Sequence, residues 1–243
     1  MKSDQPGQVQ VVAPERLPED EALLRVVAKD VAARVLRTDL DQPGFAHLDL
    51  GTAWEERDFR QLLVRLGLAL GDVSRERFGR GLEFFSLGRF DQQVSTEAHR
   101  DGAPEESILM LGYEPTPVAS RLFLLDFTRA ALARGLSPAE FLERINPLTP
   151  EGRAALEPFA AEVSKFDPAH FHIVTINNSS LPLESRERGM LGVLHRAIIP
   201  KPDPAASRVV NSLVLTPRVE GEERRIGPDE LREFIDFGRT VLS

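Results

Sequence analysis

Short strand-like runs separated by glycine, proline and charged turns fill the chain from Gly81 onward, and this texture most constrains its fold. Before it, apolar residues recur at three- and four-residue steps, which predicts amphipathic helices over residues 18–37 and 54–70, the second ending at Gly71. A strand is expected between them, over residues 44–50. Further strands are predicted over residues 82–87, 92–98, 107–111, 121–127, 171–177, 190–199 and 208–215.

Helical spacing returns in two places within and after the strand-rich region. Three helices are expected as an insertion, over residues 130–134, 138–145 and 150–163, and a closing helix over residues 228–241. Helices followed by many short strands favour a β-sandwich or small barrel buttressed by helices over alternating βαβ units. We therefore predict a mainly β fold with flanking helices. The prediction is one domain over residues 16–243 with an insertion at about 128–163, after a loose polar tail over residues 1–15.

Composition excludes several classes of function. The chain has no cysteine, which removes disulfides, thiolate metal sites and cysteine nucleophiles, so any metal must be held by histidine and carboxylate. The net charge is −8 and no basic run interleaved with aromatic residues is present, which argues against a nucleic-acid partner. The glycine-rich dinucleotide and phosphate-binding signatures are missing. No apolar run is long enough to span a membrane or act as a secretory signal, so we expect a cytoplasmic protein.

A candidate metal site begins with His99 and Asp101, two residues apart in a predicted strand. Side chains at this spacing point to the same face of a strand, so the imidazole and the carboxylate converge. His195 lies in a separate apolar run of strand type. Two histidines and one carboxylate on one face of an iron leave three positions open, which is the arrangement of non-haem Fe(II) oxygenases.

Other histidines in similar motifs are interpreted as structural. His47 and Asp49 repeat the His-x-Asp spacing, but a short motif of this kind is a weak signal without context. His170 and His172 follow a probable turn and are expected to belong to the start of a strand. The run over residues 186–188 is expected to be a solvated loop.

A cation, Arg208, follows His195 by 13 residues (208 − 195). An arginine facing the interior of a barrel needs an anionic partner, because an isolated buried charge is very costly. A carboxylate that binds in a bidentate manner fits the guanidinium best.

In their order and approximate spacing, His99, Asp101, His195 and Arg208 resemble the Fe(II)/2-oxoglutarate-dependent oxygenases of the taurine dioxygenase-like and clavaminate synthase-like branch. The resemblance covers about residues 80–215 and implies a double-stranded β-helix (jelly-roll) core. It implies that His99, Asp101 and His195 bind Fe(II). It also implies that 2-oxoglutarate chelates the iron while its far carboxylate pairs with Arg208, and that O2 takes the last open coordination position. The implied reaction is hydroxylation with release of succinate and CO2.

The chain departs from the family pattern at a segment that often contains Gly-Gly-x-Thr, four residues before a common aspartate. If Asp126 is that aspartate, Leu122 occupies the threonine position, and the nearest hydroxyl on the same strand face is Ser120, which we predict as a second cofactor-binding residue. The asparagine that commonly lies shortly before the distal histidine is also displaced, since Asn177 and Asn178 are further upstream.

The substrate is expected to be a small polar metabolite such as an amino-acid derivative. Predicted substrate-binding residues are Gln93, Arg100 and Asn177, and the helical insertion is expected to act as a cover. Two other classes of function stay open from the sequence. One is a cupin-type metal enzyme that does not use 2-oxoglutarate, and the other is a non-catalytic β-barrel binding protein. The oligomeric state is not predicted.

Overall fold

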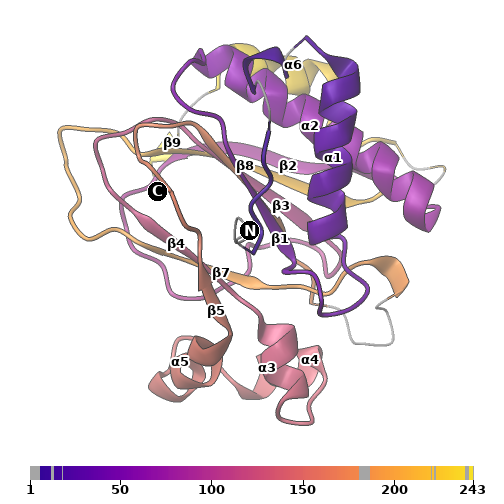
Figure 1. Ribbon diagram of the computed structural model, residues 1–243, viewed down its shortest axis with the longest axis vertical. Coiled ribbons are helices and arrows are strands. Elements are labelled where there is room, and N and C mark those ends of the chain that lie inside the picture. The colour runs from indigo at the N-terminus through magenta and orange to yellow at the C-terminus, as the bar shows by residue number, and fades with distance from the viewer. Residues whose placement is uncertain are drawn as a thin grey trace.

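Most strands and helices in the computed structural model follow the predicted order, but the short strands over residues 160–162 and 241–242 were not predicted and no strand forms over residues 92–98 (Figure 1). The strands are β1 (Phe45–Asp49), β2 (Leu82–Asp91), β3 (Ile108–Tyr113), β4 (Arg121–Leu125), β5 (Ala160–Glu162), β6 (His172–Asn177), β7 (Leu194–Ile198), β8 (Val209–Pro217) and β9 (Val241–Leu242). The helices are η1 (Pro14–Arg16), α1 (Glu21–Val35), α2 (Glu56–Phe78), α3 (Phe127–Leu132), α4 (Pro138–Arg144), α5 (Pro150–Leu156), η2 (Glu157–Phe159) and α6 (Pro228–Asp236). The structure describes residues 6–11, 14–17, 19–180, 187–219, 221, 223–238 and 241–242.

Two sheets face each other at the centre of the fold. The larger has the strand order β1-β6-β3-β8-β2-β9 and the smaller has the order β5-β4-β7. All neighbouring strands are antiparallel except β2 and β9. This arrangement confirms the predicted mainly β fold with flanking helices and is consistent with a jelly-roll core.

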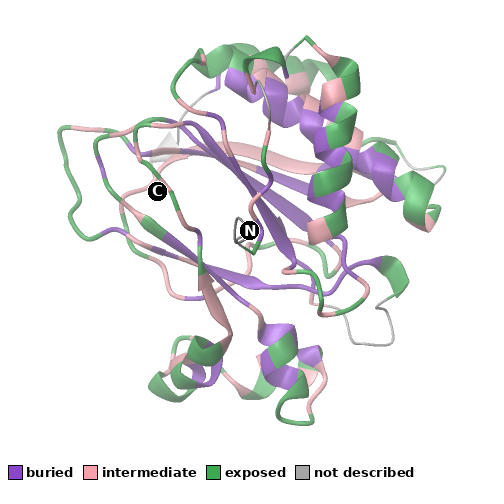
Figure 2. Ribbon diagram, in the orientation of Figure 1, coloured by how far each residue is buried: buried purple, intermediate pink, exposed green. Residues whose placement is uncertain are grey.

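The fold has three apolar cores, because successive side chains along each strand point to opposite faces of the sheet. The inner faces of the two sheets share one core, which includes Leu109, Leu111, Leu122, Leu124, Val174 and Val210. On the outer face of the larger sheet, α1 and α2 bury their apolar stripes, and Figure 2 shows these helices buried on the sheet side and exposed on the other. None of the helices in the described part of the chain has the length and apolarity that a membrane span requires.

The third core joins the outer face of the smaller sheet to the helical lobe, defined as residues 127–159 from α3 to η2 (Figure 1). Phe127, Phe141 and Leu156 of the lobe pack against Phe123 and Leu125 of β4. The helix predicted over residues 138–145 matches α4 to within one residue, whereas the helix predicted over residues 130–134 overlaps α3 only at residues 130–132. The third predicted helix, over residues 150–163, ends instead at Leu156, because residues 160–162 form a strand that pairs with β4.

The second long helix also differs from its prediction. Gly71 was expected to end it, yet α2 continues to Phe78 and is closed by Gly79, whose φ of 70° suits a glycine cap. Gly71 has a packing role, because a Cβ atom there would lie 2.7 Å from the carbonyl oxygen of Leu82. The predicted start of the first helix at residue 18 and residues 239–240 of the predicted closing helix lie outside the described residues, and the described part of that closing helix ends at Asp236.

Residues 7–9 run beside β1, so the predicted loose tail over residues 1–15 does not describe them. The N–H of His47 donates to the carbonyl of Gly7 (2.8 Å), and the N–H of Val9 donates to the carbonyl of His47 (3.0 Å). Residues 1–5, 12 and 13 of that predicted tail lie outside the described residues.

A buried ion pair connects the N-terminal helix to the smaller sheet. Arg37, directly after α1, is 1% exposed and makes two hydrogen bonds to the carboxylate of Asp126, at 2.8 and 2.9 Å. Its remaining donors bind the carbonyl oxygens of Gln42, Leu191 and Gly192. Because Gly192 lies just before β7, this arginine fixes the approach of the chain to that strand.

The motif His47-x-Asp49 lies on β1, away from the predicted metal ligands, beside a second group of histidines. Nε2 of His47 is 3.1 Å from Nδ1 of His172, and Nδ1 of His170 is 2.8 Å from the carboxylate of Asp49. The ring of Phe166 stacks on His172 with centroids 4.3 Å apart. Nδ1 of His47 lies 3.3 Å from Oε1 of Gln8, so both ring nitrogens of His47 have partners.

Lowering the pH from 6.5 towards 3 is expected to destabilise the protein through His47. Burial, together with repulsion from His172, lowers the pKa of His47 from 6.5 to about 3. Between these values the unfolded chain binds a proton that the folded chain does not, so stability falls as the pH falls, by at most roughly 3–5 kcal/mol. Denaturant unfolding across this range should show a shallower pH dependence for His47→Gln than for the wild type. An identical pH dependence in the two proteins would contradict this expectation.

Candidate metal centre

The segment that leads to the first predicted ligand runs beside β7 without forming a regular strand. The strand expected over residues 92–98 is therefore wrong. The N–H of Ala197 donates to the hydroxyl oxygen of Thr96 (3.0 Å), and the N–H two residues later donates to the hydroxyl oxygen of Ser95 (2.9 Å). Because side-chain hydroxyls replace backbone carbonyls as acceptors, the regular ladder of hydrogen bonds is interrupted.

A single isolated bridge forms at His99, which pairs with His195 on β7. The N–H of each residue donates to the carbonyl oxygen of the other, at 3.0 Å in both directions. Residues directly opposite each other in an antiparallel pair point to the same face, so both imidazoles enter the space between the sheets. Their ring centroids are 4.2 Å apart.

The structure brings the three predicted ligands together. Oδ1 of Asp101 lies 3.4 Å from Nε2 of His99 and 3.5 Å from Nε2 of His195. Among the residues that the structure describes, these three form the one group of histidine and acidic side chains whose ligand atoms all lie within 4.8 Å of one another. Two nitrogen donors and one oxygen donor this close together fit a divalent transition metal such as Fe(II).

Hydrogen bonding of Nδ1 leaves Nε2 of His99, the nitrogen nearer Asp101, available to bind a metal. Its Nδ1 lies 2.7 Å from the carbonyl oxygen of Glu97, which can only accept, so Nδ1 carries the hydrogen and Nε2 is available. Nδ1 of His195 is buried and has no hydrogen-bond partner among the described residues.

Electrostatics within the group favour the ligand forms of two side chains at neutral pH. Burial lowers the pKa of His195 to about 4, so this imidazole is neutral. Burial tends to raise the pKa of Asp101, but its hydrogen bond with His99 and the nearby histidines lower it overall, so the carboxylate is ionised. The hydrogen bond with Asp101 raises the pKa of His99, which shows that the carboxylate attracts positive charge to this point. A metal ion would replace that proton.

The three ligands line a cavity of about 190 Å³ between the sheets. Its other lining residues are Phe90, Gln92, Thr96, Leu111, Tyr113, Ala197, Val210 and Ser212. The volume corresponds to roughly six water molecules at liquid density, which suits a small organic molecule.

Arg208 lies directly behind this cavity. It is 2% exposed, and its guanidinium donates to the carbonyl of Gln92 (3.0 Å) and to the hydroxyl of Ser120 (3.1 Å). The guanidinium carbon lies 5.2 Å from the ring centroid of Tyr113, which lines the cavity, whereas Arg208 itself does not. Its side chain forms no ion pair with a carboxylate of the described residues. Burial lowers the pKa of Arg208, and the Tyr113 hydroxyl and the nearby carboxylate of Asp91, which accepts a hydrogen bond from the backbone N–H of Arg208 at 2.9 Å, offset this effect only in part.

The remaining predicted site residues are placed differently. Ser120 contacts Arg208 and is not a lining residue of the cavity. The amide of Gln93 bonds to the backbone of Asp203 and Ala206, and so supports the loop before Arg208. Arg100 donates to the carbonyls of Asn178 and Pro104 and is partly exposed beside the ligands.

Asn177 is fully buried on the helix side of the larger sheet. Its amide donates to the carbonyls of Val35 and Gly189, which gives it a structural role. Contacts of Gln93, Arg100 and Asn177 with a substrate stay predictions.

Two residues at the site were not singled out from the sequence. Tyr113 ends β3, and burial raises its pKa to about 12, so its hydroxyl stays protonated beside Arg208. The sequence did carry a signal for Tyr113, because Leu109, Leu111 and Tyr113 are spaced two residues apart and therefore lie on one face of the strand. Glu97 acts through its backbone carbonyl, which no side-chain pattern reveals.

Comparisons with known proteins give weak likenesses. No family model and no curated protein sequence matches the chain. Among solved structures, the iron and α-ketoglutarate-dependent endoperoxidase NvfI aligns with a TM-score of 0.38 and 12% identity, over 76% of this chain and 81% of the other. The non-heme iron oxygenase OrfP aligns with a TM-score of 0.39 and 12% identity, over 82% of each chain.

Replacing a candidate ligand is expected to weaken metal binding strongly. For Asp101→Ala or His99→Ala, Co(II) affinity measured by calorimetry should fall at least about 100-fold, because each variant removes one of three donors. His170→Ala, which removes a partly exposed histidine elsewhere, serves as the control and should bind Co(II) like the wild type. Wild-type affinity in the Asp101 variant would show that the metal binds elsewhere.

Proposed function

We propose that this chain is an Fe(II)- and 2-oxoglutarate-dependent oxygenase of the taurine dioxygenase-like and clavaminate synthase-like branch. Its two sheets would then form the double-stranded β-helix core of that family. One observation supports the proposal: one feature lines the cavity, and a second lies behind Tyr113, which also lines it. These are a donor set of two histidines and one carboxylate, and a buried guanidinium without a carboxylate partner among the described residues.

The donor set holds the metal in the proposed enzyme. His99, Asp101 and His195 would bind Fe(II), which when bound supplies the redox chemistry that activates O2. The hydrogen bond from His99 to the carbonyl of Glu97 fixes the orientation of that ring. Burial keeps His195 neutral, and therefore able to act as a ligand, well below neutral pH.

Arg208 supplies the binding energy for the cosubstrate. Its guanidinium is already desolvated, so a carboxylate that approaches it gains a charge-assisted hydrogen bond at little additional cost. Ser120 and the carbonyl of Gln92 orient the guanidinium. In this proposal Ser120 acts by holding Arg208, and the hydroxyl of Tyr113 lies on the path between Arg208 and the metal cavity.

The walls of the cavity restrict both water and the size of the substrate. Apolar side chains from four strands, Phe90, Leu111, Ala197 and Val210, exclude water from the region beside the ligands. Gln92, Thr96 and Ser212 offer amide and hydroxyl groups on the same cavity. These features support a small polar substrate such as an amino-acid derivative, with Arg100 at the edge of the site.

Arg208→Gln is expected to weaken 2-oxoglutarate binding without weakening metal binding. In anaerobic titrations, the weak visible charge-transfer band of chelated Fe(II) should require roughly 10- to 100-fold more 2-oxoglutarate, because one charge-assisted contact is lost. Arg121→Gln, which removes a surface guanidinium paired with Glu162, is the matched control and should titrate like the wild type.

The same titration separates the other classes of function. Metal binding without any response to 2-oxoglutarate would favour a cupin-type enzyme and contradict the proposal. If His99→Ala leaves the biological function of the protein intact, the protein is instead a non-catalytic β-barrel binding protein.

The substrate class can be tested by uncoupled turnover. Succinate formation should rise when a bound substrate analogue is present, and the panel should contain amino acids, sulfonates and peptides. We expect the largest increase with a small amino-acid derivative, because the cavity is small and its free polar groups are neutral. No increase with any member of the panel would rule out this substrate class.

A further inference from the structure

Both histidine ligands are preceded in the chain by residues that belong to the core of the helical lobe. Ala98 comes before His99 and Leu194 comes before His195, and both side chains are buried in the cluster that contains Phe127 and other lobe residues. The two imidazoles point to the opposite side, into the metal cavity. The lobe therefore forms the rear support of the peptide segments that present these ligands.

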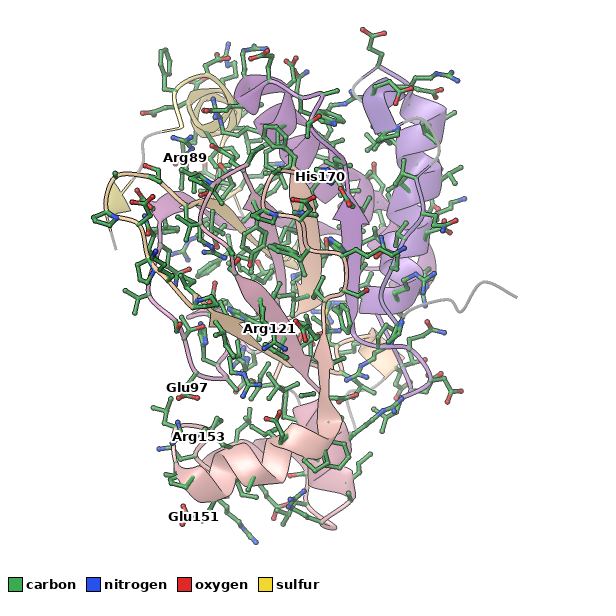
Figure 3. All side chains as sticks on the ribbon, turned by 60° about the vertical axis from the view of Figure 1, so that its left-hand side comes forward. Arg89, Glu97, Arg121, Glu151, Arg153 and His170 are labelled. Atoms are coloured by element: carbon green, nitrogen blue, oxygen red, sulfur yellow. The ribbon has the colours of Figure 1, made fainter. Side chains whose placement is uncertain are left out.

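Two ion pairs from one short helical segment reinforce this support. Arg153 of α5 pairs with the carboxylate of Glu97, two residues before His99, and Figure 3 shows Glu97 on the side of the sandwich that faces α5 and Arg153. Glu157 of η2, four residues after Arg153, pairs with Arg196 at 3.3 Å. Arg196 directly follows His195, so one turn of helix contacts the residue two positions before His99 and the residue directly after His195.

The first of these contacts extends to the imidazole itself. The carbonyl oxygen of Glu97 accepts the Nδ1 hydrogen of His99 at 2.7 Å, so the position of this peptide sets the orientation of the ring. Groups that bond to the far nitrogen of a ligating histidine are known to influence metal affinity strongly. Movement of Glu97 would therefore turn the Nε2 of His99 away from the other two donors.

The helical lobe does not cover the cavity. Residues 127–159 are all described by the structure, and none of them lines the metal cavity. The lobe packs on the outer face of the smaller sheet, whereas the cavity lies on the inner face. The sequence-based expectation that this insertion acts as a cover therefore does not fit its position.

We propose that residues 153–157 are a positioning element for the metal centre. Arg153 holds His99 through Glu97, and Glu157 holds His195 through Arg196. This inference rests on the proposed function only in requiring that the site binds a metal.

The test compares Co(II) binding to Arg153→Gln and to the wild type. Removing a cation near the site would by itself favour binding of a divalent ion, so a purely electrostatic role predicts tighter binding. A positioning role predicts weaker binding. We expect Kd to rise about three- to tenfold, at or below the low end of known outer-shell effects, because the pair with Glu97 is partly exposed. Glu157→Gln is less informative, since the loss of an anion weakens metal binding in either case.

Arg144→Gln is the matched control, because it removes the same charge from α4 of the same lobe, where Arg144 pairs with Glu140. Its Kd for Co(II) should stay within twofold of the wild type. Arg153→Lys retains the charge and should recover most of the affinity. Melting temperatures of all variants show whether each remains folded.

A second readout reports on the ring of His99 directly. In the Co(II)-loaded protein, the Nδ1 hydrogen of His99 should give a paramagnetically shifted proton resonance. Arg153→Gln should shift this resonance or accelerate its exchange with water, and Arg144→Gln should leave it unchanged. Binding of Co(II) by Arg153→Gln that is as tight as in the wild type, or tighter, would overturn the inference alone. Failure of the wild type to bind Co(II) would overturn both the inference and the proposed function.

Discussion

The reciprocal backbone hydrogen bonds between His99 and His195 are the constraint on which the candidate metal centre depends. They make two residues that are far apart in sequence direct neighbours across a strand pair, with both imidazoles on the inner face. Asp101 is then close to both rings, although the preceding segment is not a strand. The hydroxyls of Ser95 and Thr96 keep this segment beside β7 where the backbone ladder is interrupted.

Two buried arginines differ in how the fold compensates their positive charge. Arg37 is 1% exposed, and its donors are satisfied by the carboxylate of Asp126 and by three backbone carbonyls, so its charge is neutralised within the fold. Arg208 is 2% exposed but contacts one carbonyl, one hydroxyl and an aromatic face. Burying a guanidinium without an anion is costly. In the proposed enzyme, a carboxylate of 2-oxoglutarate would supply the anion that Arg208 lacks.

Features of the fold that depend on local sequence patterns were predicted from the sequence. Apolar periodicity gave the helices and most strands, and the spacing of His99, Asp101 and His195 gave the donor set, because strand pairing is strongly constrained when one face is buried. The predictions are wrong where contacts between residues far apart in sequence determine the local structure. Side-chain hydroxyls replace the ladder over residues 92–98, Gly71 packs against a later strand, and the role of Glu97 depends on its backbone and on a helix 56 residues further along.

The central claim is that His99, Asp101 and His195 bind one iron together. An anomalous-scattering map, recorded at the iron absorption edge from crystals grown anaerobically with Fe(II), tests it most directly. We predict a single strong peak at roughly 2.0–2.3 Å from Nε2 of both histidines and from a carboxylate oxygen of Asp101. A strong peak at another position, or no peak between these three side chains, would contradict the account.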